Sequence, residues 1–138
     1  MAATVPGSEV YTATTVIHAS ADEVFEYVRR PEHQPRWATR FVRSTRPLGG
    51  GRWEMETPFG AMSYRVEADA ARGTIDFVFE MPAGEQVTPA RVVPHPAGSL
   101  FTFTISRAPG TPDEAWEQGK QGMDKELEQL KTILEQEA

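Results

Sequence analysis

The chain has 138 residues, no cysteine and a net charge of −6 at pH 7, with 39% hydrophobic and 25% charged residues. This size and composition are typical of one globular domain, and the lack of cysteine excludes disulfide bonds, thiolate metal sites and cysteine nucleophiles. The acidic balance argues against general nucleic-acid binding. The N-terminus has no signal-peptide pattern, and no apolar run approaches the roughly 18 residues of a membrane span. We therefore expect a cytoplasmic domain over residues 1–138, with a flexible segment at residues 1–8.

The first third of the chain predicts a strand over residues 10–19 and then a short helix. Ser20 and Glu23 have the spacing of a capping box, in which each side chain satisfies a free backbone amide at the start of the helix. Pro31 ends this helix, because the residue before a proline disfavours the α conformation.

A second short helical segment is expected around the sequence EHQPRW. If it forms a helical turn, His33 and Trp37 are four residues apart and share one face. Trp37 then fills the end of the core and forms the wall of any pocket there. For His33 two interpretations stay open: an imidazole at the rim of a site, or an ordinary surface histidine.

Residues 43–107 alternate between apolar and polar side chains, which predicts strands with one apolar and one polar face. The clear segments are 52–57, 62–68, 74–81 and 99–107, and weaker proline-containing ones are 43–48 and 90–95. Short joints rich in glycine and proline make neighbouring segments antiparallel partners. The predicted apolar face carries Trp53, Met55, Met62, Tyr64, Phe77, Phe79, Met81, Phe101 and Phe103. The residues between them, Val78 among them, are expected on the face toward water.

The last segment predicts one long amphipathic helix. Thr111 is the expected cap, Pro112 the first helical residue and Glu114 the partner of a second capping box. From Trp116 to Leu134 the apolar residues follow a period of 3.6.

Two glycines inside this helix need an explanation, because each costs about 0.5–1 kcal/mol relative to alanine. Gly119 lies on the apolar stripe with Trp116 and Met123, next to Gly122 on the adjoining turn. Either another segment approaches the helix closely, or empty volume lies beneath it.

Chemical motifs are scarce. The three histidines, His18, His33 and His95, have no metal-ligand spacing, and no nucleophile or phosphate-loop motif is present. Tyr64 places a hydroxyl in an apolar row, and a buried tyrosine usually finds a hydrogen-bond partner. Arg91 would be a buried cation suited to an anion if its face is the inner one, and a solvated arginine if it is not.

Charge is unevenly distributed along the chain. Seven arginines and one acid occupy residues 29–52, and eight acids and three lysines occupy residues 113–138. These segments are either two solvated faces of opposite sign, or the arginines steer an anionic ligand toward a cleft.

The order of elements and the local sequences at residues 14–37 and 51–56, with the amphipathic terminal helix, resemble the START-like helix-grip superfamily. The chain is most similar to its bacterial polyketide cyclase/dehydrase and lipid-transport branch, over about residues 9–134. The resemblance implies an α+β fold: a curved antiparallel sheet of about seven strands wraps around the long C-terminal helix, with two short helices after the first strand. It also implies a cavity between sheet and helix in which family members bind apolar molecules and a minority act on them.

We therefore expect a small-molecule binding protein whose ligand is apolar or aromatic, with or without an anionic group. A cyclase/dehydratase-type enzyme and a protein-interaction module are the alternatives. No catalytic residue, metal or cofactor is assigned. The predicted ligand-binding residues are Trp37, Trp53, Met55, Tyr64, Phe77, Phe79, Arg91, Phe101, Phe103, Trp116, Gly119 and Met123.

Overall fold

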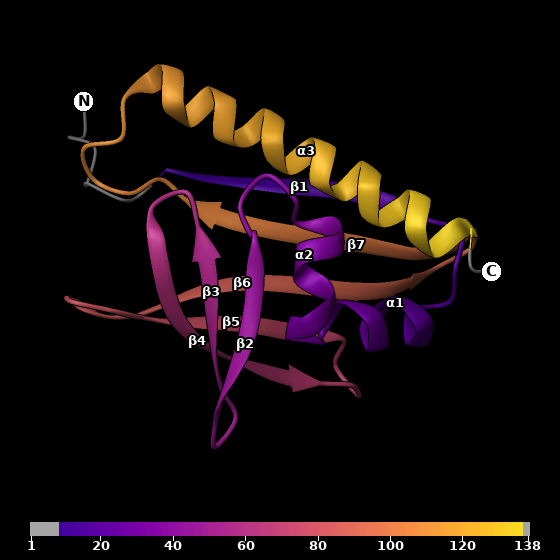
Figure 1. The fold of residues 1–138 in the computed structure, drawn as a ribbon. Coiled ribbons are helices and arrows are strands. Elements are labelled where there is room, and N and C mark those ends of the chain that lie inside the picture. Colours follow the sequence, from indigo (N-terminus) through magenta and orange to yellow (C-terminus); the bar gives the residue numbers. More distant parts are fainter. Residues whose placement is uncertain (1–8, 137–138) are drawn as a thin grey trace.

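The computed structural model describes residues 9–136 (Figure 1). The segment expected to be flexible, residues 1–8, lies outside this range. Within it the predicted α+β helix-grip architecture is confirmed: a seven-stranded antiparallel sheet, short helices after the first strand and one long C-terminal helix. No helix in this range is long and apolar enough to cross a bilayer.

Strand β1 (Val10–Ile17) leads into helix α1 (Ala21–Val28), which has the predicted cap. The backbone N–H of Glu23 donates to Ser20 Oγ at 3.2 Å, and the Ser20 hydroxyl donates to the Glu23 carboxylate at 3.0 Å. A 3-10 turn (Pro31–His33) and the one-turn helix α2 (Gln34–Trp37) follow. The proline after α1 therefore ends one helix and begins the next helical segment.

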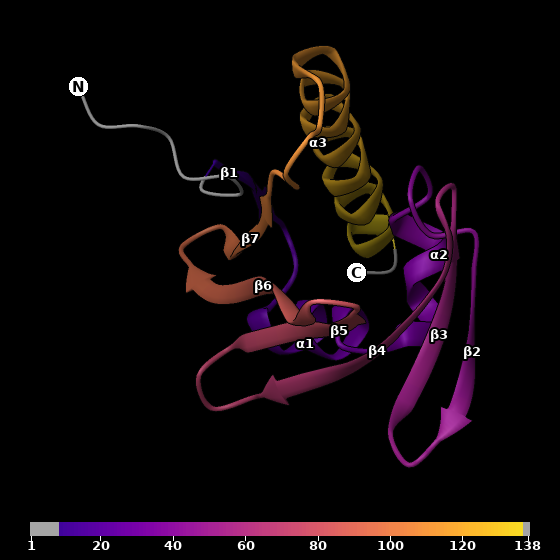
Figure 2. The same ribbon diagram turned by 90° about the vertical axis from the view of Figure 1, so that its left-hand side faces the viewer.

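The remaining strands follow in chain order and pair in the sheet order β1-β7-β6-β5-β4-β3-β2. They are β2 (Ser44–Gly49), β3 (Arg52–Thr57), β4 (Gly60–Asp69), β5 (Thr74–Met81), β6 (Gly84–His95) and β7 (Gly98–Ser106). Viewed along the strands, the sheet curves so that β2 and β1 stand at opposite sides and α3 (Asp113–Gln136) lies across the opening between them (Figure 2).

A proline determines where strands β6 and β7 separate. The N–H of Val92 donates toward the β5 side, to the carbonyl of Gly73 at 2.8 Å. Because strand residues alternate, the nitrogen of Pro89 faces β7, and proline has no N–H to donate. Pairing of β6 with β7 accordingly begins at Ala90 opposite Phe103, while residues 84–89 pair only with β5.

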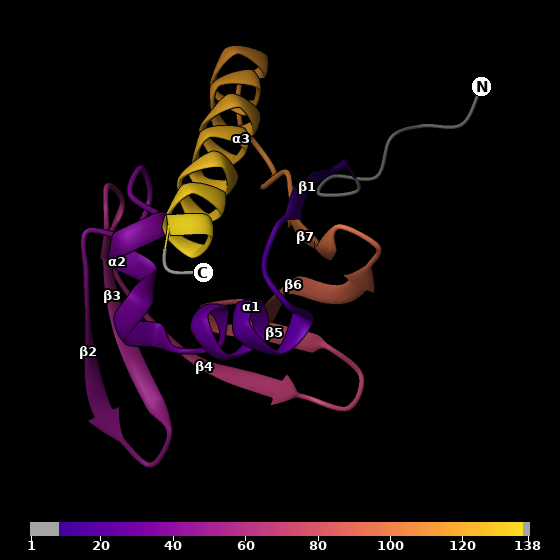
Figure 3. The same cartoon turned by 90° about the vertical axis from the view of Figure 1, so that its right-hand side faces the viewer.

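Helix α3 is held at its two sides. Toward β1, the Tyr11 hydroxyl donates to Asp124 at 2.7 Å and Lys131 Nζ donates to the carbonyl of Val16 at 2.8 Å. On the other side α3 packs against α2, as the view from the right of Figure 1 shows (Figure 3). The helix begins at Asp113, one residue later than predicted, and the Pro112 carbonyl accepts the Trp116 N–H at 3.0 Å.

The core lies on the concave face of the sheet. Its largest fully buried side chains are Trp37, Tyr64, Phe77, Phe101, Ile17, Met55, Ile75, Leu130, Val24 and Val28. The burial of two side chains of β5 differs from the prediction, although the alternation of the strand holds. Val78 was expected in water but is 2% exposed, and its strand neighbour Arg65 ion-pairs with Glu67 and Glu85 on the outer face. Met81 was expected inside but is 37% exposed, at the end of the hairpin that leaves β7.

Candidate functional site

The concave face of the sheet is buried at one end and accessible at the other. Along β7, Phe101 is fully buried, whereas Phe103 and Ile105 are partly exposed. Along β5, which runs in the same direction, Phe77 is 1% exposed and Phe79 is partly exposed. The accessible end lies beside the N-terminal half of α3, because Tyr11, opposite Ile105, contacts Asp124.

We call this accessible surface the apolar groove and define its floor by Met62, Phe79, Phe103 and Ile105. These side chains lie on the face toward α3 and pack on the core, yet none is fully buried. Gly119 of α3 lies above the same end. It is exposed, and a Cβ added to it would have no neighbour within 4 Å. The N-terminal half of α3 therefore leaves apolar surface accessible.

A second, fully buried layer lies deeper along the same face. Trp37, Met55, Tyr64, Phe77 and Phe101 belong to it, and Met123 of α3 packs in the same cluster. The indole ring of Trp37 meets the Phe101 ring edge-on at 6.2 Å and the Phe103 ring at 5.8 Å between centroids. Trp37 thus contacts Phe103, one of the residues that form the floor of the apolar groove.

Polar groups are few in this interior. The Tyr64 hydroxyl donates to Gln34 Oε1 at 2.5 Å, and the two residues are 0% and 4% exposed. Burial, with a smaller contribution from the Glu32 charge, raises the pKa of Tyr64 above its ordinary value of 10.0, so this group stays a neutral hydroxyl. The Trp37 indole Nε1 is buried without a hydrogen-bond partner among the described residues.

Gln34 was not predicted, although its neighbours were considered. Gln34 and Trp37 are three residues apart on α2, so they share one helix face. His33 points elsewhere: its ring stacks on Tyr27 at 4.1 Å and its Nδ1 lies 2.8 Å from the Tyr27 carbonyl oxygen. His33 lines a separate hollow of about 290 Å³ beside α1 and the end of α3. The signal that identifies Gln34 is the i,i+3 spacing to the buried tryptophan.

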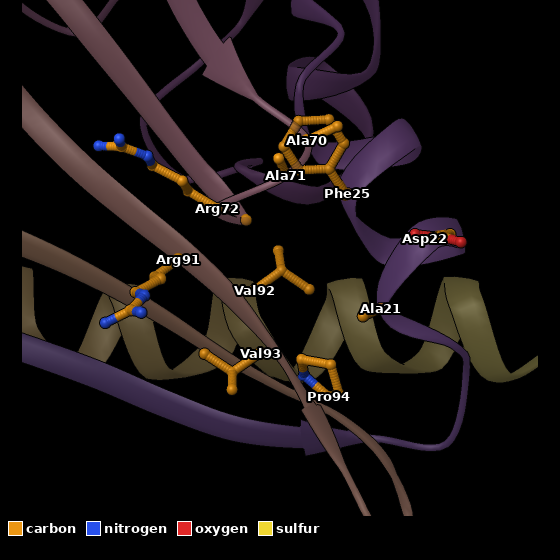
Figure 4. Close-up of a pocket in the computed structure, with 11 residues that line it drawn as sticks. Ala21, Asp22, Phe25, Ala70, Ala71, Arg72, Arg91, Val92, Val93 and Pro94 are labelled. Carbon is orange, nitrogen blue, oxygen red and sulfur yellow. The ribbon is translucent and has the colours of Figure 1, made fainter.

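Arg91 does not line the interior, because its side chain is exposed while Ala90 and Val92 on either side are each 3% exposed. It borders a second hollow, of about 210 Å³, between the β4–β5 turn, β6 and the start of α1. There Arg72 and Arg91 extend away from Asp22 (Figure 4). Strand alternation places Arg91 on the outer face, so the solvated-arginine interpretation holds.

Two further predicted residues, Trp116 and Trp53, lie at the margins of the groove. Trp116 is 7% exposed, outside the main core cluster, with Lys120 Nζ 5.7 Å from its ring centroid. Trp53 is partly exposed on the concave face, in one cross-strand row with Tyr64 and with Phe79 of the groove floor. Gly119 contacts no closely approaching segment. The glycine that another segment approaches closely is Gly122, where an added Cβ would lie 3.0 Å from Arg40 Nε.

A buried acid connects α3 to the segment before β2. Glu126 is 6% exposed, and its Oε2 accepts the backbone N–H groups of Arg40 at 3.2 Å and Phe41 at 3.3 Å. Burial raises the pKa of Glu126 to about 7 against the lowering effect of these two N–H groups and of the Arg40 charge. The acid-rich tail was interpreted as a solvated face. The available signal that one acid faces inward was spacing, because Glu126 lies three residues after Met123 and so shares its helix face.

Most arginines of the basic segment are paired with acids. Arg29 contacts Glu26 at 2.7 Å, Arg46 contacts Glu54 at 2.9 Å, and Arg52 contacts Glu80 at 3.0 Å. The segment is therefore largely an ion-paired surface.

Within residues 9–136 no cluster of three or more His, Asp or Glu side chains could hold a metal ion.

A curved antiparallel sheet wrapped around a long terminal helix, with short helices after the first strand, defines a START-like helix-grip protein. Solved structures support this fold. A START superfamily protein from Mycobacterium smegmatis superimposes with a TM-score of 0.73 at 15% identity, covering 94% of this chain and 99% of that one. The Aha1 dimer protein from Colwellia psychrerythraea gives 0.71 at 16% identity, with 92% and 96% covered.

A third structure is the di-domain ARO/CYC protein StfQ of the steffimycin biosynthetic pathway. It superimposes with a TM-score of 0.67 at 16% identity, covering 94% of this chain and 45% of that one. At the level of sequence, a family model described as "Polyketide cyclase / dehydrase and lipid transport" matches residues 9–135. The chain belongs to this family. No curated protein matches its sequence.

Proposed function

We propose that this chain binds an apolar or aromatic small molecule in the apolar groove, and that it acts as a binding protein. The observation that carries the proposal is the accessible floor of Met62, Phe79, Phe103 and Ile105 beneath a helix that carries no side chain at Gly119. Apolar side chains that stay accessible inside a concave surface are the usual lining of small-molecule sites. Membership of a family described by polyketide cyclisation and lipid transport supports the same class of ligand.

The chemistry of the interior favours binding over turnover. A general acid or base works best when its pKa lies near the working pH. Tyr64 is held neutral by burial. The pKa of Glu126, about 7, would suit proton transfer, but its Oε2 is engaged by the two backbone N–H groups of Arg40 and Phe41. A cyclase/dehydratase activity would need another proton-exchanging group in the groove, and the apolar floor supplies none.

Titration with a naphthalene-based fluorescent hydrocarbon tests the proposal. Gly119→Leu fills the open space, so its affinity should fall roughly tenfold or more relative to the parent chain. Gln118→Leu is the matched control, because it adds the same side chain at an exposed position of the same helix. Equal affinity of all three proteins, or no binding to the parent, would refute the proposed site.

Native mass spectrometry against cell extracts then separates carriage from turnover. A retained adduct of unchanged mass is expected for a binding protein. A product of altered mass that accumulates with time would identify an enzyme instead.

A further inference from the structure

The interior holds a buried hydrogen-bond donor that the protein leaves unused. Trp37 is 0% exposed, and its indole Nε1–H has no partner among the described residues. Leaving such a group unpaired costs about 1–3 kcal/mol, so buried polar groups in folded proteins are nearly always satisfied. A partner supplied from outside the chain would remove this penalty.

A second donor lies on the same helix face. The Tyr64 hydroxyl donates to Gln34 Oε1. This hydrogen bond fixes the orientation of the Gln34 amide and occupies its oxygen. Among residues 9–136 no hydrogen bond uses the Gln34 amide nitrogen, so it is available as a donor. Gln34 and Trp37 are one helical turn apart, and a carbonyl oxygen has two lone pairs that can accept from two such groups.

The surroundings distinguish a neutral acceptor from a charged one. Trp37 packs in the hydrophobic core cluster, and Arg91, the cation considered for this role, is on the outer face. Arg40, which lies beside Gly122 of α3, already acts on the charge of Glu126. A carboxylate would be buried there without a counter-charge, which is strongly unfavourable, whereas a neutral carbonyl needs only the N–H donors. The ring of Trp37 touches Phe103, whose accessible part forms the groove floor, so a ligand in the groove lies next to this layer.

We infer that the ligand is an apolar molecule with a neutral carbonyl oxygen at its inner end, and that Trp37 Nε1–H is the group that recognises it. The inference rests on the proposed function, since it needs a ligand in the groove. It makes Trp37 a specificity-determining residue that separates ketones or esters from hydrocarbons and from carboxylic acids of the same shape.

Three matched probes test it: 6-propionyl-2-dimethylaminonaphthalene, its 6-propyl hydrocarbon analogue, and 6-dimethylamino-2-naphthoic acid. The parent chain should bind the ketone most tightly and the acid least. Trp37→Phe should weaken ketone binding about 3- to 10-fold, the range expected for one hydrogen bond, while leaving the hydrocarbon within about twofold. In the Trp37→Phe variant the emission of the bound ketone should also shift to the blue, because a hydrogen bond to the carbonyl of this fluorophore moves its emission to the red and the variant loses that bond.

Phe25→Leu is the control, since Phe25 is a buried ring that lines the outer hollow beside α1 and does not belong to the groove floor. It should leave the ratio of ketone to hydrocarbon affinity unchanged. Because Trp37→Phe also removes ring volume, replacing Trp37 by benzothienylalanine, which keeps the ring shape and lacks the N–H, gives a second variant. It should reproduce the selective loss for the ketone with the thermal midpoint unchanged.

The outcomes separate the two proposals. If the parent chain binds neither the ketone nor the hydrocarbon, the proposed function fails and this inference fails with it. If both bind, but removing the N–H affects them equally or not at all, the groove stands and the role of Trp37 is refuted. Tightest binding of the acid would refute the assignment of a neutral carbonyl.

Discussion

At the scale of residues, the one-turn helix α2 supplies two buried side chains of the interior, Gln34 and Trp37. The sequence allowed Trp37 to be assigned to the core, because a tryptophan in a proline-bounded corner has few alternatives to burial, and it is 0% exposed. The partner of Tyr64 could not be assigned. The Tyr64 hydroxyl reaches Gln34 across 30 residues of sequence, and only the packing of α2 on the sheet brings them together.

Tyr64→Phe tests the strength of this contact. It removes the donor to Gln34 Oε1 and leaves a buried amide oxygen unsatisfied, which should lower the free energy of unfolding by about 1–3 kcal/mol. Urea denaturation should show a lower midpoint with an unchanged slope. A loss below about 0.5 kcal/mol would mean that water replaces the hydroxyl.

At the scale of elements, the periodicity of α3 predicted its length and its inward stripe, because both follow from local sequence. The roles of its two glycines depend on what lies opposite and could not be predicted. Gly119 faces open space, whereas Gly122 accommodates Arg40. Likewise, Glu126 is buried because the backbone of the segment before β2 supplies two donors to it.

Replacing each glycine by alanine should change the free energy of unfolding by different amounts. Gly119→Ala adds a Cβ that meets nothing, so the gain in helix propensity should raise the free energy of unfolding by about 0.5–1 kcal/mol. Gly122→Ala needs Arg40 to move from 3.0 Å, so its gain should be smaller or absent. Parallel urea denaturations measure the difference, and a larger gain at Gly122 would contradict the geometry.

Glu126 should make stability depend on pH near neutrality. Its pKa is about 7 in the folded chain and 4.5 ordinarily, so between these values the folded state holds a proton that the unfolded state has lost. The contribution of Glu126 to the free energy of unfolding therefore decreases as pH rises through this window and is constant above it.

Glu126→Gln keeps an acceptor for the two N–H groups and removes the titration. Relative to the parent chain it should gain stability as pH rises, by about 1–3 kcal/mol between about pH 5 and about pH 8. Denaturation curves across this range check the slope. Parallel profiles for the two proteins would show that Glu126 stays ionised throughout.

At the scale of the whole molecule, the antiparallel order of strands followed from short joints between alternating segments, and the helix-grip architecture followed from the resemblance. Where the sheet opens could not be read from alternation. It is set by Pro89, which ends the β6–β7 ladder, and by the resulting positions of Phe79 and Ile105. The choice between an inward and a solvated Arg91 could not be made for a related reason, because which face of β6 is inward depends on its register with β5 and β7.

The central claim is that a small molecule occupies the space between the concave face and the first half of α3. Isotope-filtered nuclear Overhauser spectra of the chain with bound 6-propyl-2-dimethylaminonaphthalene test it most directly. Cross-peaks from the naphthalene protons to the methyl groups of Met62, Ile105 and Met123 are predicted. Cross-peaks to Val93, beside the outer hollow, with none to those three residues, would contradict it.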